Sequence, residues 1–146
     1  MGTITTAMCS SFKEELLGGV HDLDTHTLKL ALIKPSPTGS YGAATTNYSV
    51  LTGNSDEATG TNYSAGGQAL DSASITLSGT TAFVDFADEV FSNLTITAAG
   101  AIIYNTSASN KAIAVFSFGS NVASTAGDFT VIFPTADASN AVIRIT

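Results

Sequence analysis

The chain has 146 residues, which is the size of one ordinary domain. Its formal net charge is -7, and only 12% of its residues are charged, about half the share that is usual in globular domains. The basic residues number 5 and are scattered, which argues against nucleic acids and anionic membranes, because both are bound through clustered Lys and Arg. Cys9 is the single cysteine, so no internal disulfide is possible.

The N-terminal residues predict an arm followed by a short helix. Residues 1–10 show no clear periodicity, no basic and apolar secretory signal, and no run near the ~20 apolar residues of a membrane span, so we expect a flexible arm on a protein that folds in a cytoplasm. Ser11 and Glu14 match a capping box at the start of a helix, and Gly18-Gly19 should end it. About two turns cannot be stable alone, so this helix should dock on a sheet.

The remainder of the chain predicts an all-β domain over residues 11–146. Residues 36–67 form a long Gly-, Thr-, Asn- and Ser-rich loop, with a short strand or turn of helix at 47–51. Short apolar stretches bounded by turn residues predict strands at 27–34, 68–70, 73–77, 80–86, 129–133 and 140–145. A loop is expected at 120–127. About eight strands with one short N-terminal helix indicate an antiparallel β-sandwich of the jelly-roll or Ig-like kind.

The central feature is a predicted hairpin over residues 93–119, with its turn at Asn105–Asn110. In the returning strand Phe116 and Phe118 share one face with two alanines, and Ile113 and Val115 share the other. Because both faces are apolar, the strand should be covered on both sides, either by its own domain or by another subunit. We therefore predict that Ile113 and Val115, or Phe116 and Phe118, lie at or near a subunit or inter-sheet contact.

No group of polar residues makes a convincing catalytic or metal site. The segment His21–His26 holds two imidazoles and two carboxylates, yet the odd spacing would separate the imidazoles on a strand, and a hydrogen-bonded turn is the better interpretation. Asp85, Asp88 and Glu89 are interpreted as a solvated acidic turn, and Cys9 has no neighbouring base in sequence. We predict no enzyme activity, no cofactor and no metal.

Three segments resemble a family of small structural proteins of tailed bacteriophages. They are residues 12–29, 59–70 and 82–104, and Phe118-Gly119 and Gly127–Thr130 extend the likeness, whereas Phe91 stands where a tryptophan would be expected. The resemblance implies a virion component, in the first place a capsid decoration (cement) protein on the outer head surface, assembled in the host cytoplasm. It also implies a homotrimer bound to the major capsid protein, with no catalytic residues. The arm and the long loop could order on such a neighbour.

Other functions remain open from the sequence. The chain could be a tail, neck or baseplate module of the same virion. It could also be a carbohydrate-binding sandwich that stacks sugars on Tyr41, Tyr48 and Tyr63, although the absence of Trp counts against this. The same three tyrosines belong to our predicted interface residues. A hydrolase with an unrecognised site is the least favoured interpretation.

Overall fold

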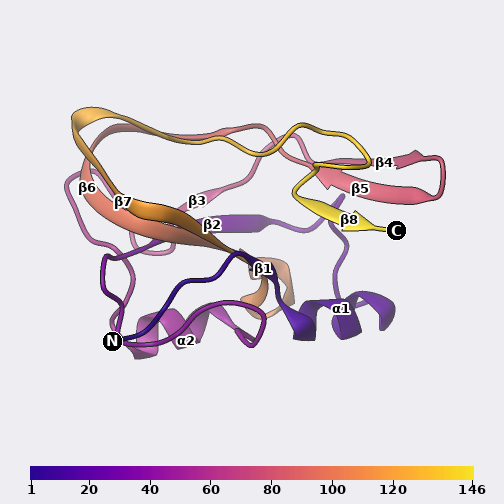
Figure 1. Ribbon diagram of the computed structural model, residues 1–146, viewed down its shortest axis with the longest axis horizontal. Coiled ribbons are helices and arrows are strands. Elements are labelled where there is room, and N and C mark those ends of the chain that lie inside the picture. Colours follow the sequence, from indigo (N-terminus) through magenta and orange to yellow (C-terminus); the bar gives the residue numbers. More distant parts are fainter.

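Two antiparallel sheets of unequal size make up most of the computed structural model, which describes residues 1–146 (Figure 1). The larger sheet has five strands in the order β1-β7-β6-β2-β3, and the smaller has three in the order β4-β5-β8. The elements are β1 (Ala7–Met8), α1 (Ser10–Leu17), β2 (Leu28–Ile33), α2 (Tyr48–Gly53), β3 (Gln68–Ala69), β4 (Ser74–Ser78), β5 (Thr81–Asp85), β6 (Glu89–Asn105), the 3-10 helix η1 (Thr106–Ala108), β7 (Lys111–Val131) and β8 (Ile143–Ile145). The predicted all-β antiparallel sandwich of about eight strands is confirmed.

The predicted central hairpin is confirmed, and it is longer than expected. Its strands β6 and β7 have 17 and 21 residues, and the turn between them is capped by the Asn105 side chain, which accepts a hydrogen bond from the Ser107 N–H. Ser109 and Asn110 adopt the left-handed backbone conformation, with φ of 55° and 61°. Turn-forming residues at 105–110 therefore predicted the geometry correctly.

The expected loop at 120–127 and the separate strand at 129–133 are corrected by the structure. β7 includes the first segment and residues 129–131 of the second, and ends at Val131; Ser124 pairs with Ile96 and Phe129 pairs with Phe91. Most side chains from 120 to 127 are exposed and small or polar, so they give no apolar signal. Backbone pairing to the apolar strand β6 holds this segment in the sheet.

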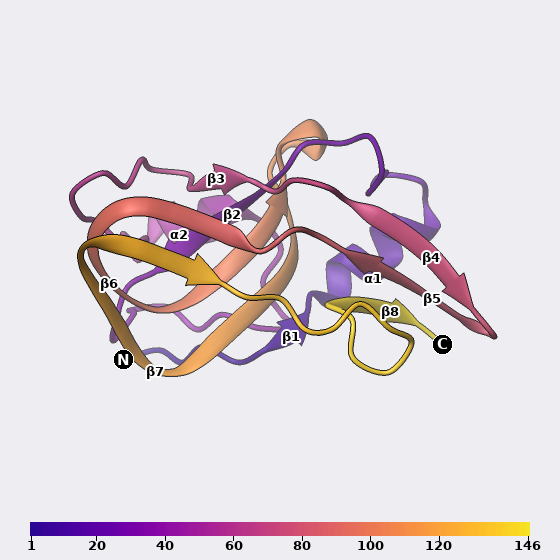
Figure 2. The same cartoon turned by 90° about the horizontal axis from the view of Figure 1, so that it is seen from above.

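The hairpin bends over itself, which turns one sheet into two packed layers. Figure 2 shows both long strands curling at one end and returning across β2 and β3. The bend coincides with a register shift between Ala98 and Gly100. A Cβ at Gly100 would lie 2.4 Å from the Phe116 carbonyl oxygen, so only glycine allows this close approach.

The two-sided burial of the returning strand comes from the domain itself. Ile113 and Val115 are fully buried, and α1 packs against β7. Phe116 is half-buried on the other face, with its ring 6.4 Å from that of Phe133. Phe118 is also half-buried, 6.1 Å from the Phe129 ring. These contacts join layers of one chain, so Ile113 and Val115 leave no surface for a partner subunit.

The N-terminal segment expected to be a flexible arm lies against the domain. The Gly2 N–H donates to the Pro37 carbonyl oxygen at 2.7 Å, and the Thr5 N–H donates to that of Tyr41 at 2.9 Å. Strand β1 then pairs with β7. Residues 1–10 therefore have partners within their own chain.

The helix α1 starts two residues earlier than the capping box predicted, at Ser10 instead of Phe12. Cys9 is the N-cap, without a side-chain cap bond, and the buried Ser11 hydroxyl has no hydrogen-bond partner. The predicted end is confirmed, since Gly18 is the C-cap and Gly19 follows with φ of 75°. Tertiary packing of the fully buried Phe12 fixes this helix, rather than local capping.

Candidate interaction site

The long loop is organised by two adjacent carboxylates rather than left free for a ligand. The buried Asp56 accepts hydrogen bonds from the Thr38 N–H at 2.8 Å, the Gly39 N–H at 2.7 Å and the Tyr41 hydroxyl at 2.7 Å. Lys34 adds an ion pair at 3.0 Å. Burial alone would raise the pKa of Asp56, but these contacts outweigh it and hold the pKa well below its usual range. Asp56 is therefore a structural anion.

Glu57 gathers the tyrosines on the other side of the same loop. Its carboxylate accepts hydrogen bonds from the hydroxyls of Tyr48 and Tyr63 and from the Gly66 N–H. Tyr48 also stacks on Tyr104, with ring centroids 4.3 Å apart and planes 8° apart. Burial is the main cause that raises the pKa of Tyr48 and of Tyr63.

The predicted tyrosine surface is therefore absent. Tyr41 is only 2% exposed, and burial together with Asp56 raises its pKa to about 12. Tyr48 and Tyr63 are half-buried, with their hydroxyls directed at Glu57. A sugar-stacking platform needs open ring faces on several aromatic side chains. These three residues instead form internal supports of the loop.

The two histidines do meet, and an amide rather than a metal position lies between them. The buried Asn105 Nδ2 lies 2.9 Å from Nδ1 of His21 and 2.9 Å from Nδ1 of His26. His21 Nε2 lies 3.1 Å from Glu15, which also pairs with Lys111 at 2.8 Å. No group of three or more His, Cys, Asp or Glu side chains is arranged to hold a metal ion. This chain of bonds ties the connection after α1 to the turn of the hairpin.

The remaining candidates are also engaged within the fold. Cys9 is fully buried, and burial followed by the nearby charge of Glu15 raises its pKa to about 12, so its thiol stays protonated. Asp88 accepts from the Phe133 N–H at 2.9 Å. Glu89 is bonded to Gln68 at 2.9 Å, and burial is the first cause that raises its pKa. Each group has a local structural partner.

The small sheet carries the surface that the sequence reasoning missed. Strand register places six apolar side chains on one face, which we call the small-sheet face. Its members are Ile75, Leu77, Ala82, Val84, Ile143 and Ile145. Val84 and Ile143 are buried, at 6% and 2% exposure, whereas Ile75, Leu77 and Ile145 are 53%, 72% and 53% exposed. One half of an apolar sheet face is therefore bare.

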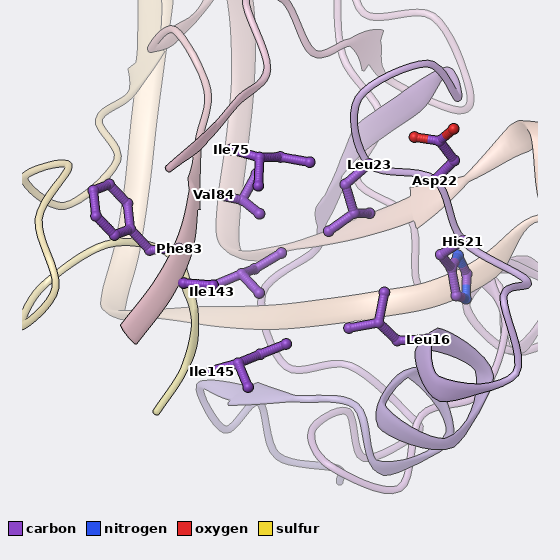
Figure 3. Close-up of a pocket in the computed structure, with 10 residues that line it drawn as sticks. Leu16, His21, Asp22, Leu23, Ile75, Phe83, Val84, Ile143 and Ile145 are labelled. Atoms are coloured by element: carbon purple, nitrogen blue, oxygen red, sulfur yellow. The ribbon is translucent and has the colours of Figure 1, made fainter. Parts of the chain in front are cut away.

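This face looks across a groove toward α1 and the segment that follows it. Figure 3 shows Val84, Ile143 and Ile145 reaching toward Leu16 and Leu23, whereas Phe83 points the other way. The cavity between them has a volume of about 390 Å³. In Figure 1 the small sheet and α1 lie at the same end of the molecule.

A second cavity continues the groove past β8. It has a volume of about 400 Å³ and shares Leu16 and Ile145 with the first. We call the two cavities together the α1 groove. Leu17, at its mouth, is 92% exposed. Exposed apolar side chains gathered along a groove in this way are typical of interaction sites.

Two free cations line the mouth of the α1 groove. Lys13 and Arg144 both border the second cavity, and neither takes part in the ion pairs of the chain. The Arg144 guanidinium donates only to the Ala138 carbonyl oxygen, at 3.2 Å. These two cations are the charged residues among those that line the second cavity. Nearby, hydrogen bonds from Asn140 and Ser139, and after them the charge of Arg144, lower the pKa of Asp137.

Comparisons with protein-family models, with curated protein sequences and with solved structures give no match. No helix has both the length and the apolar character needed to cross a bilayer. The interpretation of the α1 groove therefore rests on its geometry and on the resemblance of the three sequence segments.

Proposed function

We propose that this chain is a structural protein of a tailed-bacteriophage virion, a capsid decoration (cement) protein that binds the outer head surface and stabilises contacts between capsomers. The observation that carries the proposal is the bare half of the small-sheet face beside the exposed Leu17. Large aliphatic side chains exposed together at one end of a domain favour a protein contact. The particle to which they bind is supplied by the family resemblance.

The arrangement of the other polar groups supports a binding role over a catalytic one. The buried Asp56 is held by four donors, and the thiol of Cys9 has a raised pKa of about 12. The two histidines are both bonded to Asn105. None of these groups is presented together with a nucleophile at an open cavity, as acid-base or nucleophilic catalysis requires.

The proposed partners are the major capsid protein of the same virion and further copies of this chain in a homotrimer. A half-bare sheet face and a long groove give a subunit more than one contact area at the same end of the domain. The net charge of -7 keeps the unbound protein soluble while leaving the groove apolar. Assembly would take place in the host cytoplasm.

A tail, neck or baseplate module is the second candidate, and the same surface would serve it. The exposed aliphatic side chains identify a protein contact without identifying the particle. The choice therefore depends on which purified virion part binds the chain. The carbohydrate-binding alternative has no open tyrosine surface to support it, because Tyr41 is 2% exposed.

Co-sedimentation with purified particles tests the proposal. Wild-type protein should pellet with undecorated capsids, and Leu17→Glu should abolish pelleting because it places a charge at the mouth of the groove. Ile132→Glu is the matched control, since Ile132 is 75% exposed but does not line the α1 groove. Binding to isolated tails and not to heads would establish the second candidate. Failure to bind either particle would refute both, and light scattering that shows only monomer would refute the trimer.

A further inference from the structure

We propose that the α1 groove receives an extended segment of another polypeptide, with alternating apolar and acidic residues, which adds as a strand to the free edge of β8. The proposal deepens the function proposed above and rests on it for the partner being a protein of the same particle. Three separate features of the groove lead to it: a free backbone edge, a bare apolar floor and a pair of free cations.

The first of these features is the free backbone edge of β8. β8 is the outer strand of the small sheet and pairs only with β5. Its other side carries backbone N–H and C=O groups without sheet partners and borders the second cavity through Arg144 and Ile145. An edge of this kind is a template for strand addition. An incoming strand would supply the missing hydrogen bonds.

The apolar floor lies where the side chains of such a strand would point. On β8, Ile143 and Ile145 face the groove, and Arg144 lies on the alternate side. Across the groove lie Leu16 and Leu17 of α1. An added strand would therefore place every second side chain between the sheet and the helix. Those side chains should be aliphatic.

The charged residues at the groove predict the remaining side chains of the incoming strand. Lys13 and Arg144 border the cavity without ion pairs. The Asp22 carboxylate at the far end is bonded within its own turn, to the Thr25 hydroxyl at 2.7 Å. Glu14, beside Lys13 in sequence, is exposed and lines neither cavity. Lys13 and Arg144 are the charged residues among those that line the second cavity, so carboxylates on the incoming segment would complement that end of the groove.

Two other occupants fit these features less well. A second copy docked through the same face would bring two pairs of cations together, which costs free energy. A fatty acid could neutralise the cations, but it would leave the edge of β8 unpaired. A polypeptide strand would pair with the backbone edge, cover the apolar floor and complement the charges.

Designed peptides test the proposal on the intact chain. Three short peptides alternate valine with glutamate, with lysine or with serine, and titration calorimetry measures their binding. The glutamate peptide should bind at least about tenfold more tightly than the lysine peptide, because its carboxylates attract the two cations and the lysine ammonium groups repel them. Hydrogen exchange should show new protection of amides in Ile143–Ile145, which simple surface contact would not produce.

Charge-reversal variants give the control. Lys13→Glu and Arg144→Glu together should reverse the order of the glutamate and lysine peptides, and both side chains are exposed, so folding should persist. Ser120→Glu adds charge at an exposed site that does not line the groove and should leave the order unchanged.

Several outcomes would overturn the inference. These are equal affinity for the three peptides, no binding at millimolar peptide, protection outside β8, binding of dodecanoate in place of the peptides, or self-association abolished by the same charge reversals. If capsids still bind the wild-type chain in any of these cases, the proposed function stands and only the strand partner is wrong. If the glutamate peptide binds but no particle does, the groove accepts an acidic strand and the proposed function is wrong.

Discussion

The two sheets are built from similar apolar strands, yet only the larger one has a central apolar region that its own chain buries completely. In the large sheet, Ile102 and Ile113 are completely buried. In the small sheet, Leu77 and Ile145 stand on one apolar face at 72% and 53% exposure. The large sheet is covered because β6 and β7 bend back over it and α1 packs on it. Leu77 and Ile145 form the exposed outer row of the small sheet, and no part of the chain covers them.

This contrast separates residues that maintain the fold from residues that are free to act. Burial of an aliphatic side chain contributes about 1.5–3 kcal/mol relative to leaving it exposed. The large sheet gains this contribution within one chain. The outer row of the small sheet can gain it only when a partner covers it. Substitutions in the two sheets should therefore affect different measurements.

The largest difference should follow truncation of matched aliphatic residues. Ile113→Ala should lower the free energy of unfolding by about 2–5 kcal/mol, because it leaves a cavity in a fully buried site. Leu77→Ala should change it by no more than about 0.5 kcal/mol, since its side chain is already exposed. Urea denaturation followed by circular dichroism measures both. Comparable losses in the two variants would show that the small-sheet face is covered in solution.

Loss of the Asp56 carboxylate should lower the free energy of unfolding nearly as much as Ile113→Ala does, through lost hydrogen bonds instead of a cavity. Asp56→Ala leaves the Thr38 and Gly39 N–H groups and the charge of Lys34 without their partner, at a cost of about 3–5 kcal/mol. The long loop should loosen first, seen as faster cleavage by protease within residues 36–67. Asp24→Ala, which removes an exposed carboxylate, is the control.

The same carboxylate predicts the response to acid. Its folded pKa is lowered, so its contribution is fully present above the ordinary aspartate value of about 3.9 and is lost as the pH falls toward the folded value. Unfolding free energy should therefore drop on acidification below about pH 4. In Asp56→Asn this part of the pH dependence should be absent. An unchanged slope would mean that other carboxylates dominate acid unfolding.

A smaller loss is expected for Phe116→Ala. From the sequence alone, full burial of this ring would predict about 3–5 kcal/mol. The ring is half-buried and meets Phe133 at 6.4 Å, so we expect a loss nearer about 2 kcal/mol, measured by urea denaturation. A near-neutral result would mean that the two layers do not depend on this contact.

Local chemistry explains what the sequence could predict. The turn at Asn105–Asn110 and the helix end at Gly18-Gly19 follow from residues that favour those conformations wherever they occur. The alternating apolar residues of the returning strand correctly predicted cover on both faces. They could not reveal whether the cover was intramolecular, because that depends on the bend at Gly100.

The candidate site was missed for a related reason. Alternation in the segments 74–78 and 143–145 is visible in the sequence, and it predicts one apolar face on each strand. Whether such a face ends inside or outside depends on what packs against it. The pairing of β5 with both β4 and β8 assembles six apolar side chains that no single segment shows. The tyrosines were more conspicuous in sequence but are held inward by Asp56 and Glu57.

The smallest effect on stability should accompany a clear effect on the surface. Leu17→Ser should change the free energy of unfolding by about 0.5 kcal/mol or less, because Leu17 is 92% exposed in the folded chain. The same change should reduce binding of the dye ANS, which reports exposed apolar surface, since Leu17 lies at the mouth of the α1 groove. Ile132→Ser, at a site 75% exposed but not lining this groove, should leave most of the dye signal in place. Equal loss in both variants would mean that the groove holds no special share of the exposed apolar surface, and the contrast between the two sheets would then lose its functional meaning.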